Sequence, residues 1–148
     1  EVGAQPDMIV FTPDGTKVLT ANEGEPSDDY QVDPEGSISV IDVSNPAAPV
    51  VRTAGFGGYT GQEASLRAQG IRIYGPGASA SQDFEPEYIA VSADGTTAWA
   101  TMGTATAFSP VRAPWAHGDV HADRPMASAI SATADGRVKP SQAASAPR

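Results

Sequence analysis

Hydrophobic and polar residues follow the same pattern twice along this chain, at positions 6–21 and again at 86–101, without a gap in either copy. Each copy has a short apolar run, then a turn that contains Asp14-Gly15 or Asp94-Gly95, then a second mostly apolar run. Two runs of strand length on either side of a Gly-containing turn are typical of a β-hairpin. The pattern therefore predicts two equivalent hairpins and an all-β fold class.

Three further segments have the pattern of strands. Residues 37–43 begin with alternating polar and apolar side chains, which is typical of a half-buried strand, and Ser44-Asn45-Pro46 ends the run. Residues 49–53 fit an outer strand of the same sheet, and the alternation at 71–74 predicts another strand. The first hairpin thus has the partners it needs for a four-stranded sheet.

One short helix is expected between the two hairpins. Thr60 and Glu63 have the spacing of a capping box, in which each side chain bonds the backbone amide of the other residue. Leu66 continues the helix, and Gly70 is placed to end it in a left-handed conformation. This helix is predicted as a short insertion in a chain that is otherwise β.

A repeated hairpin is typical of a radially repeated architecture such as a β-propeller, in which each sheet covers the next. A propeller needs at least about four blades, of about 40 to 50 residues each. Two hairpins, with a faint third echo at 130–138, account for one to three blades. We therefore expect a partial propeller, with the remaining blades supplied by a longer chain.

The composition changes after position 103. Residues 104–148 contain 12 alanines and few large apolar side chains, and no strand is expected to follow Trp99. This predicts a β-propeller segment at 1–103 and a divergent, poorly ordered tail at 104–148. A third repeat and an altered reading frame near position 103 are the alternatives.

The net charge is −9, and it is concentrated in the first part of the chain. Residues 1–103 have 15 acidic and 4 basic side chains, whereas residues 104–148 have 3 acidic and 5 basic ones. Such an acidic surface argues against nucleic acid as a partner and suits cations or a basic protein, although many soluble proteins share it. The chain has no cysteine and no apolar run that approaches a membrane span, so no membrane insertion is expected.

Four stretches resemble the choice-of-anchor I domain family. They are Ala21-Asn22-Glu23-Gly24-Glu25-Pro26-Ser27-Asp28-Asp29-Tyr30, Asp33-Pro34-Glu35-Gly36-Ser37, residues 66–77 and residues 82–92. The resemblance covers roughly residues 1 to 102 and implies a secreted, periplasmic or cell-surface bacterial β-propeller. The family is similar to the mesenchyme-specific cell-surface glycoprotein, and its bacterial members are often labelled alkaline phosphatase.

The segment between the first hairpin and residue 37 is the best candidate for a metal site. It has many carboxylates, and its prolines and glycines exclude regular structure. Ca²⁺ binds six to eight oxygens, about 2.3 to 2.6 Å away, in flexible geometry. Asp83, Glu85 and Glu87 alternate along one extended segment and would share one strand face, which is expected to meet the acidic loop and complete the site. The predicted metal ligands are Glu23, Glu25, Asp28, Asp29, Asp33, Glu35, Glu85 and Glu87. The alternative is a solvated acidic loop.

These observations predict a segment that binds Ca²⁺ or a surface protein and has no catalysis of its own. The alternative is a fragment of a calcium-dependent alkaline phosphatase or phosphodiesterase, with Arg67 or Arg72 holding the phosphate ester. Residues 1–103 have no histidine, so neither a two-metal phosphatase nor a serine hydrolase finds its usual partners there. His117 and His121 have the spacing of a helical metal site, but Gly118 lies between them and argues against a helix.

Overall fold

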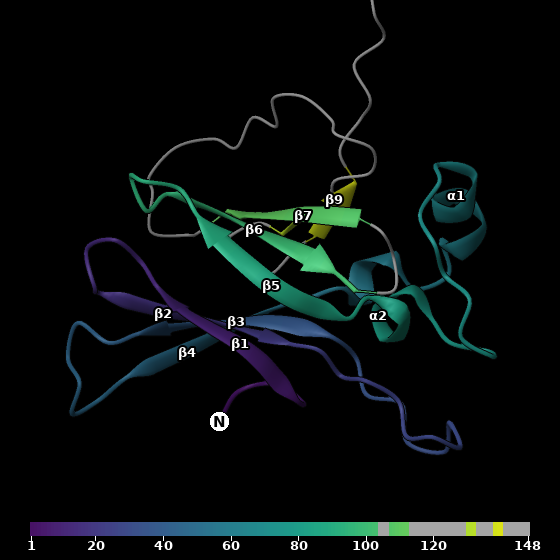
Figure 1. Cartoon of the computed structure of the whole chain (residues 1–148), viewed down its shortest axis with the longest axis horizontal. Helices are drawn as coiled ribbons and strands as arrows, with labels where there is room; N and C mark the ends of the chain where they lie inside the picture. The colour runs from purple at the N-terminus through teal and green to yellow at the C-terminus, as the bar shows by residue number, and fades with distance from the viewer. Residues whose placement is uncertain (104–106, 113–129, 133–137, 141–148) are drawn as a thin grey trace, which may run out of the picture.

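The first four strands form one antiparallel sheet in chain order. The computed structural model describes residues 1–103 in full, and the backbone alone at 107–112, 130–132 and 138–140. Each strand of this sheet pairs with the next along the chain (Figure 1). The strands are β1 (Pro6–Phe11), β2 (Lys17–Asn22), β3 (Ser37–Asp42) and β4 (Val50–Gly55). The first hairpin and the strands predicted at 37–43 and 49–53 are thus confirmed.

The second sheet begins with the second hairpin. Its first three strands are antiparallel, β8 runs parallel to β7, and β9 pairs antiparallel with β8. The strands are β5 (Pro86–Val91), β6 (Thr97–Met102), β7 (Ala107–Arg112), β8 (Ile130–Ala132) and β9 (Val138–Pro140). The expectation that no strand follows Trp99 is wrong, because the backbone of β7 pairs with β6 along its length.

The faint third echo of the hairpin corresponds to the pair β8 and β9. That pair extends the second sheet instead of beginning a new one, so it does not repeat the arrangement of the first two hairpins. The predicted disorder of the tail concerns mainly residues 104–106, 113–129, 133–137 and 141–148, which lie outside the described residues.

The two hairpins have the same strand register. Val10 lies opposite Leu19 in the first, and Ala90 lies opposite Trp99 in the second, exactly 80 positions later. Both also shift register at the same place, immediately after the proline that begins the first strand. The repeat in the sequence is therefore a repeat of backbone structure as well.

The turns of the two hairpins are equally alike. The Asp14 carboxylate accepts hydrogen bonds from the hydroxyls of Thr12 and Thr16 and from the Thr16 amide, at 2.6 to 3.0 Å. Asp94 accepts the corresponding bonds from Ser92 and Thr96, also at 2.6 to 3.0 Å. These bonds hold the pKa of both carboxyls down, at about 2.

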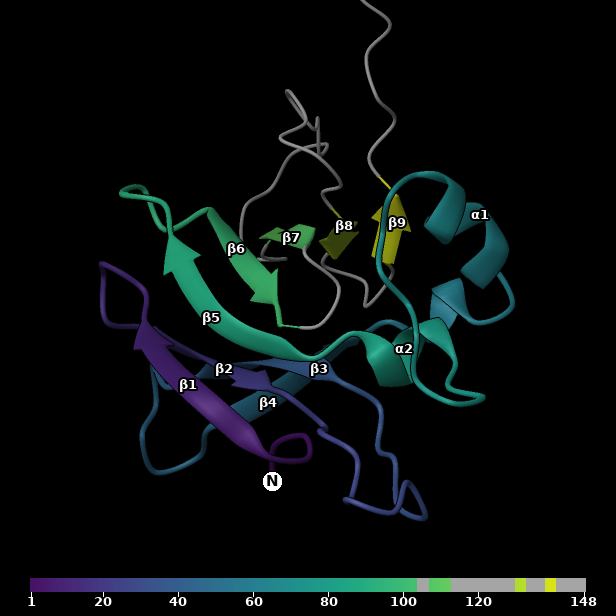
Figure 2. The ribbon, with the colours of Figure 1, turned by 45° about the vertical axis from the view of Figure 1, so that its right-hand side comes forward.

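Three short helices lie beside one end of the sheets (Figure 2). They are η1 (Gly57–Tyr59), α1 (Glu63–Ala68) and α2 (Ala80–Asp83). The predicted helix is α1, and Gly70 ends it with a φ of +86°, as expected. The prediction of a capping box at Thr60 and Glu63 is wrong, because α1 begins without a side-chain cap. Ser79 and Gln82 form a capping box at α2 instead.

The segment 71–74 is not a strand. Ile71 and Ile73 are buried and Arg72 and Tyr74 are exposed, so the alternation is real, but the segment pairs with no strand of the described residues. Its inward isoleucines pack into the core instead. One-sided burial alone produced the pattern from which a strand was predicted.

The core lies between the two sheets, and the first strands of the two hairpins lie side by side there. Strand β5 contacts both β1 and β2, and the Ile89 amide lies 3.1 Å from the Met8 sulfur. Leu19 and Ile38 of the first sheet and Ile89 and Ala100 of the second belong to one buried cluster. Phe56, Tyr59 and Phe84 extend this cluster towards the helices with edge-on ring contacts.

The sheets pack with opposite faces of the repeat. Leu19 of the first sheet points into the shared core, whereas Trp99, its equivalent 80 residues later, lies on the outer side of the second sheet. Conversely, Ile89 is buried in the core while its equivalent Ile9 is exposed. The chain is therefore mostly β with two stacked sheets, and the ring of a propeller remains a prediction.

Candidate functional site

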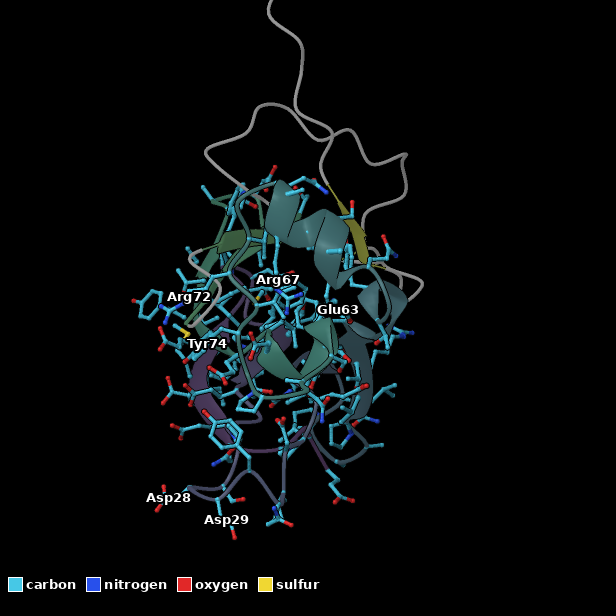
Figure 3. The ribbon with its side chains drawn as sticks, turned by 90° about the vertical axis from the view of Figure 1, so that its right-hand side faces the viewer. Asp28, Asp29, Glu63, Arg67, Arg72 and Tyr74 are labelled. Atoms are coloured by element: carbon cyan, nitrogen blue, oxygen red, sulfur yellow. The ribbon has the colours of Figure 1, made fainter. Side chains whose placement is uncertain are left out.

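The acidic segment between β2 and β3 leaves the sheets as a long loop. No helix or strand occurs at residues 23–36, as predicted, and the loop carries Asp28 and Asp29 at its far tip (Figure 3). Both side chains are exposed there, far from the labelled residues at the helical end. Asp28 and Asp29 therefore lie apart from the end of the molecule where the helices are.

A small hydrogen-bonded turn shapes this tip. The Ser27 amide donates to the Val32 carbonyl at 2.8 Å, and Tyr30 closes the turn with a positive φ of 54°. The Asp29 carboxylate accepts from the Ser27 hydroxyl at 2.8 Å and from the Gln31 amide at 3.1 Å. These bonds lower the pKa of Asp29 and occupy its carboxylate within the turn.

The end of the loop is attached to α2. The Ser81 hydroxyl donates to the Glu35 carboxylate at 2.9 Å, and the Gln82 side-chain amide donates to the Asp33 carbonyl at 2.8 Å. Gly36 passes so close to α2 that a Cβ at this position would collide with the backbone carbonyl of Phe84. The loop thus joins the first sheet to the segment that begins the second.

Asp33 lies near Asp83 at this attachment. Burial, and then the charge of Asp83, raise the pKa of the Asp33 carboxyl. Asp83 itself belongs to α2 and accepts hydrogen bonds from the Tyr74 amide at 2.6 Å and the Gly75 amide at 3.0 Å. Its role in the structure is to hold the segment that follows Ile73.

The expectation that three carboxylates share one strand face is wrong. Asp83 lies in α2, Glu85 is buried between α2 and β5, and Glu87 is exposed on β5. Because α2 includes Asp83, this residue does not have the extended conformation that the expectation required. Of the three, Glu87 is the one that lies near the beginning of the acidic loop.

A second group of carboxylates surrounds Glu23, where the acidic loop leaves β2. Burial raises the pKa of Glu23, and the charges of Asp7, Glu25 and Glu87 raise it further. The group brings together residues from β1, from the loop and from β5. We call these four residues the Glu23 group. That the loop and the second hairpin meet was predicted; that Asp7 takes part was not.

The eight predicted metal ligands are therefore divided among different places. Asp28 and Asp29 lie at the tip, Asp33 and Glu35 at the attachment to α2, Glu85 is buried, and the rest join the Glu23 group. The remaining three are Glu23 and Glu25 in the loop and Glu87 on β5. Within the described part of the chain, no three His, Cys, Asp or Glu side chains are arranged to hold a metal ion.

The arginines proposed as phosphate ligands have other contacts. The Arg67 guanidinium donates to the Ile73 carbonyl at 2.7 Å, and the Arg72 guanidinium lies over the Tyr74 ring at 4.3 Å (Figure 3). Hydrogen bonds from its own backbone amide and from the amides of Ala80 and Gly61 lower the pKa of the Glu63 carboxyl. No observation on these residues favours the phosphoesterase alternative, and His117 and His121 lie outside the described residues.

Reasoning from the sequence missed the role of Ser81. Its buried hydroxyl lies within hydrogen-bond distance of Thr60, Ser79 and Glu35, and so links three segments. The serine two positions after a helix-capping Ser79 was a visible signal, but its partner Glu35 lies 46 positions away. These partners satisfy the buried hydroxyl, and through them Ser81 joins the acidic loop to the helical segments.

These observations define a mostly β protein with two stacked sheets and an acidic loop at their edge. Residues 1–110 match the choice-of-anchor I domain, so the chain belongs to the choice-of-anchor I domain family. No curated protein and no solved structure matches the chain. In the described residues there is also no helix with the length and apolar character of a membrane span.

Proposed function

We propose that this chain is a β-propeller segment of a secreted, periplasmic or cell-surface protein, and that it binds ligands without catalysis of its own. The observation that carries the proposal is which face of each sheet lies in the contact between them. The face of the first sheet that contains Met8 and Leu19 meets the face of the second that contains Ile89 and Ala100. In the repeat, these are opposite faces.

Stacking of opposite faces is what a propeller requires. When equivalent faces meet, both sheets use the same face, so the contact is complete with two sheets and the same step cannot be repeated. When opposite faces meet, each sheet keeps a face of the other type, and repetition of the same step builds a ring if the rotation between neighbours closes. The first strands β1 and β5 lie next to each other, as neighbouring inner strands of two blades would. Further blades from a longer chain would then cover the outer faces.

A double-mutant cycle tests this stacking order. Met8→Ala and Ile89→Ala should couple by about 0.5–3 kcal/mol in the free energy of unfolding, because these residues pack in one cluster. Met8→Ala and Tyr88→Ala form the matched control, since Tyr88 precedes Ile89 on β5 but lies on its other face. Urea unfolding at low protein concentration measures both cycles. Coupling of Met8 with Tyr88 instead of Ile89 would overturn the proposal.

We propose further that the ligand is a divalent cation, Ca²⁺, held at the Glu23 group. The observation in favour is that carboxylates from three separate segments lie near Glu23, whose pKa is raised first by burial and then by the charges of Asp7, Glu25 and Glu87. A cation would relieve the repulsion between these charges, and Ca²⁺ tolerates irregular shells completed by carbonyls and water. Because the carboxylates do not form a ready shell, the ion would have to draw Glu23, Glu25 and Glu87 together.

Calorimetric titration of the whole chain with Ca²⁺ tests this second proposal. Wild type should release or absorb heat and melt at a higher temperature, and Glu23→Gln should lose most of both effects. Asp28→Asn is the matched control, because it removes an equal charge from the distant loop tip. Equal responses of the two variants, or no response of wild type at millimolar Ca²⁺, would exclude the site.

A further inference from the structure

The Met8 side chain joins the edge strands of the two sheets. Strand β1 is the first strand of one sheet and β5 is the first strand of the other, and these two edges lie side by side (Figure 2). Between them, the Ile89 amide donates a hydrogen bond to the Met8 sulfur at 3.1 Å. A thioether sulfur is a weak acceptor, so this bond holds the edge amide less firmly than a carbonyl oxygen would.

Met8 lies at the border of the shared core. Its side chain is partly buried and packs against the buried cluster, whereas Met102, which belongs to that cluster, is only 2% exposed. The chain has no cysteine, so its three methionines are its only sulfur-containing side chains, and the third, Met126, lies outside the described residues. Of the two described methionines, Met8 is therefore the one that an oxidant in solution reaches.

We propose that Met8 is a site of reversible oxidation by a hydroperoxide, and that its oxidation loosens the contact between β1 and β5. The sulfur lone pair attacks the terminal peroxide oxygen, an S–O bond forms and the O–O bond breaks. The proton of that oxygen passes to the departing one, which leaves as water or as an alcohol. Sulfur is oxidised by two electrons to the sulfoxide, and the peroxide is reduced by the same two.

The short distance between sulfur and amide is the reason why oxidation disturbs this contact. A sulfoxide oxygen that accepts from the Ile89 amide must itself lie about 2.7 to 3.2 Å from the nitrogen. The sulfur already lies 3.1 Å from that nitrogen, so the new oxygen fits between them only if the Met8 sulfur moves away. An oxygen that points elsewhere lies against the apolar cluster and loses its contact with water. Either arrangement weakens the contact.

Peroxide treatment of the full chain, followed by mass mapping of its peptides, tests the site. In the folded chain, Met8 should gain one oxygen at least about tenfold faster than Met102, because the buried Met102 reacts only when the structure opens. In concentrated urea, where both are exposed, the two rates should become similar. Similar rates in the folded chain, or no reaction at Met8, would overturn the proposal.

Urea unfolding of the oxidised chain tests the consequence. Met102→Leu and Met126→Leu together leave Met8 as the one thioether, and adding Met8→Leu gives the matched control, which has none. Leucine is close to methionine in volume and should preserve the fold. Oxidation should raise the unfolding equilibrium constant of the chain with Met8 by roughly tenfold, and methionine sulfoxide reductases should reverse this change. The control should not respond. Wild type oxidised at Met8 alone provides a second measurement.

Hydrogen exchange shows where the oxidised chain has loosened. The Ile89 amide should exchange faster after oxidation, whereas the Gly15 amide, which donates to the Thr12 carbonyl within the first turn, should change less. A sulfoxide at Met8 that leaves the unfolding equilibrium and the Ile89 exchange unchanged, or that slows the exchange, would overturn the inference. The inference goes beyond the proposed function and its failure is distinguishable, because the double-mutant cycle of Met8 and Ile89 is measured without oxidant.

Discussion

The two sheets of this protein begin with the same hairpin, yet they bury opposite sides of it. In the first sheet, Leu19 is fully buried and Ile9 points outward; in the second, Ile89 is buried and Trp99 points outward. Register, bulge and turn are the same in both. Strand pairing thus follows from the repeated residues, whereas the choice of the buried side depends on which neighbour each sheet meets.

The two sheets also differ in the chemistry of one equivalent face, which carries apolar side chains in the second sheet and polar ones in the first. Ala100 and Met102 of the second sheet correspond to Thr20 and Asn22 of the first, which are buried as well. In the first sheet the N-terminal segment lies over this place, and the Gly3 amide donates to Ser39. The first sheet therefore has a buried polar network where the second has an apolar contact.

The largest effect is expected from removing equivalent side chains of the two sheets. Leu19→Ala should cost about 2–5 kcal/mol of unfolding free energy, because it opens a cavity in the shared core. Trp99→Ala removes a larger side chain but should cost only about 1 kcal/mol, since that side chain is partly exposed. Urea unfolding at low protein concentration measures both losses of unfolding free energy. Equal losses would mean that both faces are buried alike.

Joining the two sheets correctly depends on Gly36. Gly36→Ala should cost about 1–3 kcal/mol or more, because its Cβ would collide with the Phe84 carbonyl and push the acidic loop away from α2. Gly55→Ala is the matched control, since its Cβ meets no atom within 4 Å. Thermal melting compares the two variants. A harmless Gly36→Ala would mean that the loop does not approach α2 so closely.

The polar network of the first sheet is tested by Asn22→Ala. The Asn22 amide donates to Ser39 at 2.9 Å and to Ser37 at 3.1 Å, and it accepts from Thr20. Its loss leaves buried hydroxyls without partners, at a cost of about 1–3 kcal/mol. Asn45→Ala, in an exposed turn, should stay within about 0.5 kcal/mol of wild type. Similar urea midpoints for both variants would contradict the network.

The smallest effect should come from the turns, and it should depend on pH. Both Asp14 and Asp94 have a pKa of about 2 in the folded chain, below the ordinary value of 3.8. A lowered folded pKa stabilises the protein above pH 3.8, and this stabilisation is lost as the pH falls towards 2. Asp14→Asn and Asp94→Asn should each lower the melting temperature slightly at pH 7 and by less at pH 2. Unequal effects would show that the turns differ.

Much of the fold was predictable because its signals are local. The Asp-Gly turns, the alternation at 37–43 and the terminating Gly70 each depend on neighbouring residues, and all three predictions are confirmed. The prediction of a capping box at Thr60 is wrong because α1 begins at Glu63 with Gln62 at its N-cap, and the Thr60 hydroxyl lies within hydrogen-bond distance of Ser81 instead. The strand at 71–74 failed because its alternation reflects burial against the core and no partner strand.

The acidic site was predictable only as a list of residues. Clustered carboxylates among prolines and glycines indicated an irregular acidic loop, which is confirmed. The turn at Ser27 then carries Asp28 and Asp29 away from the sheets, and α2 holds Glu35 through Ser81. Asp7 enters the Glu23 group because β1 lies beside the loop, a proximity that spacing along the chain does not indicate.

The amino-acid sequence alone determined the local structure of this protein, because turns, strand register and helix ends depend on backbone preferences and near neighbours. The tertiary structure alone decided which side of each hairpin became core and which carboxylates came together. Both depend on contacts between segments about 80 positions apart, such as that between Met8 and Ile89. Side chains with the same β-propensity can be buried or exposed, depending on whether another sheet packs against their face.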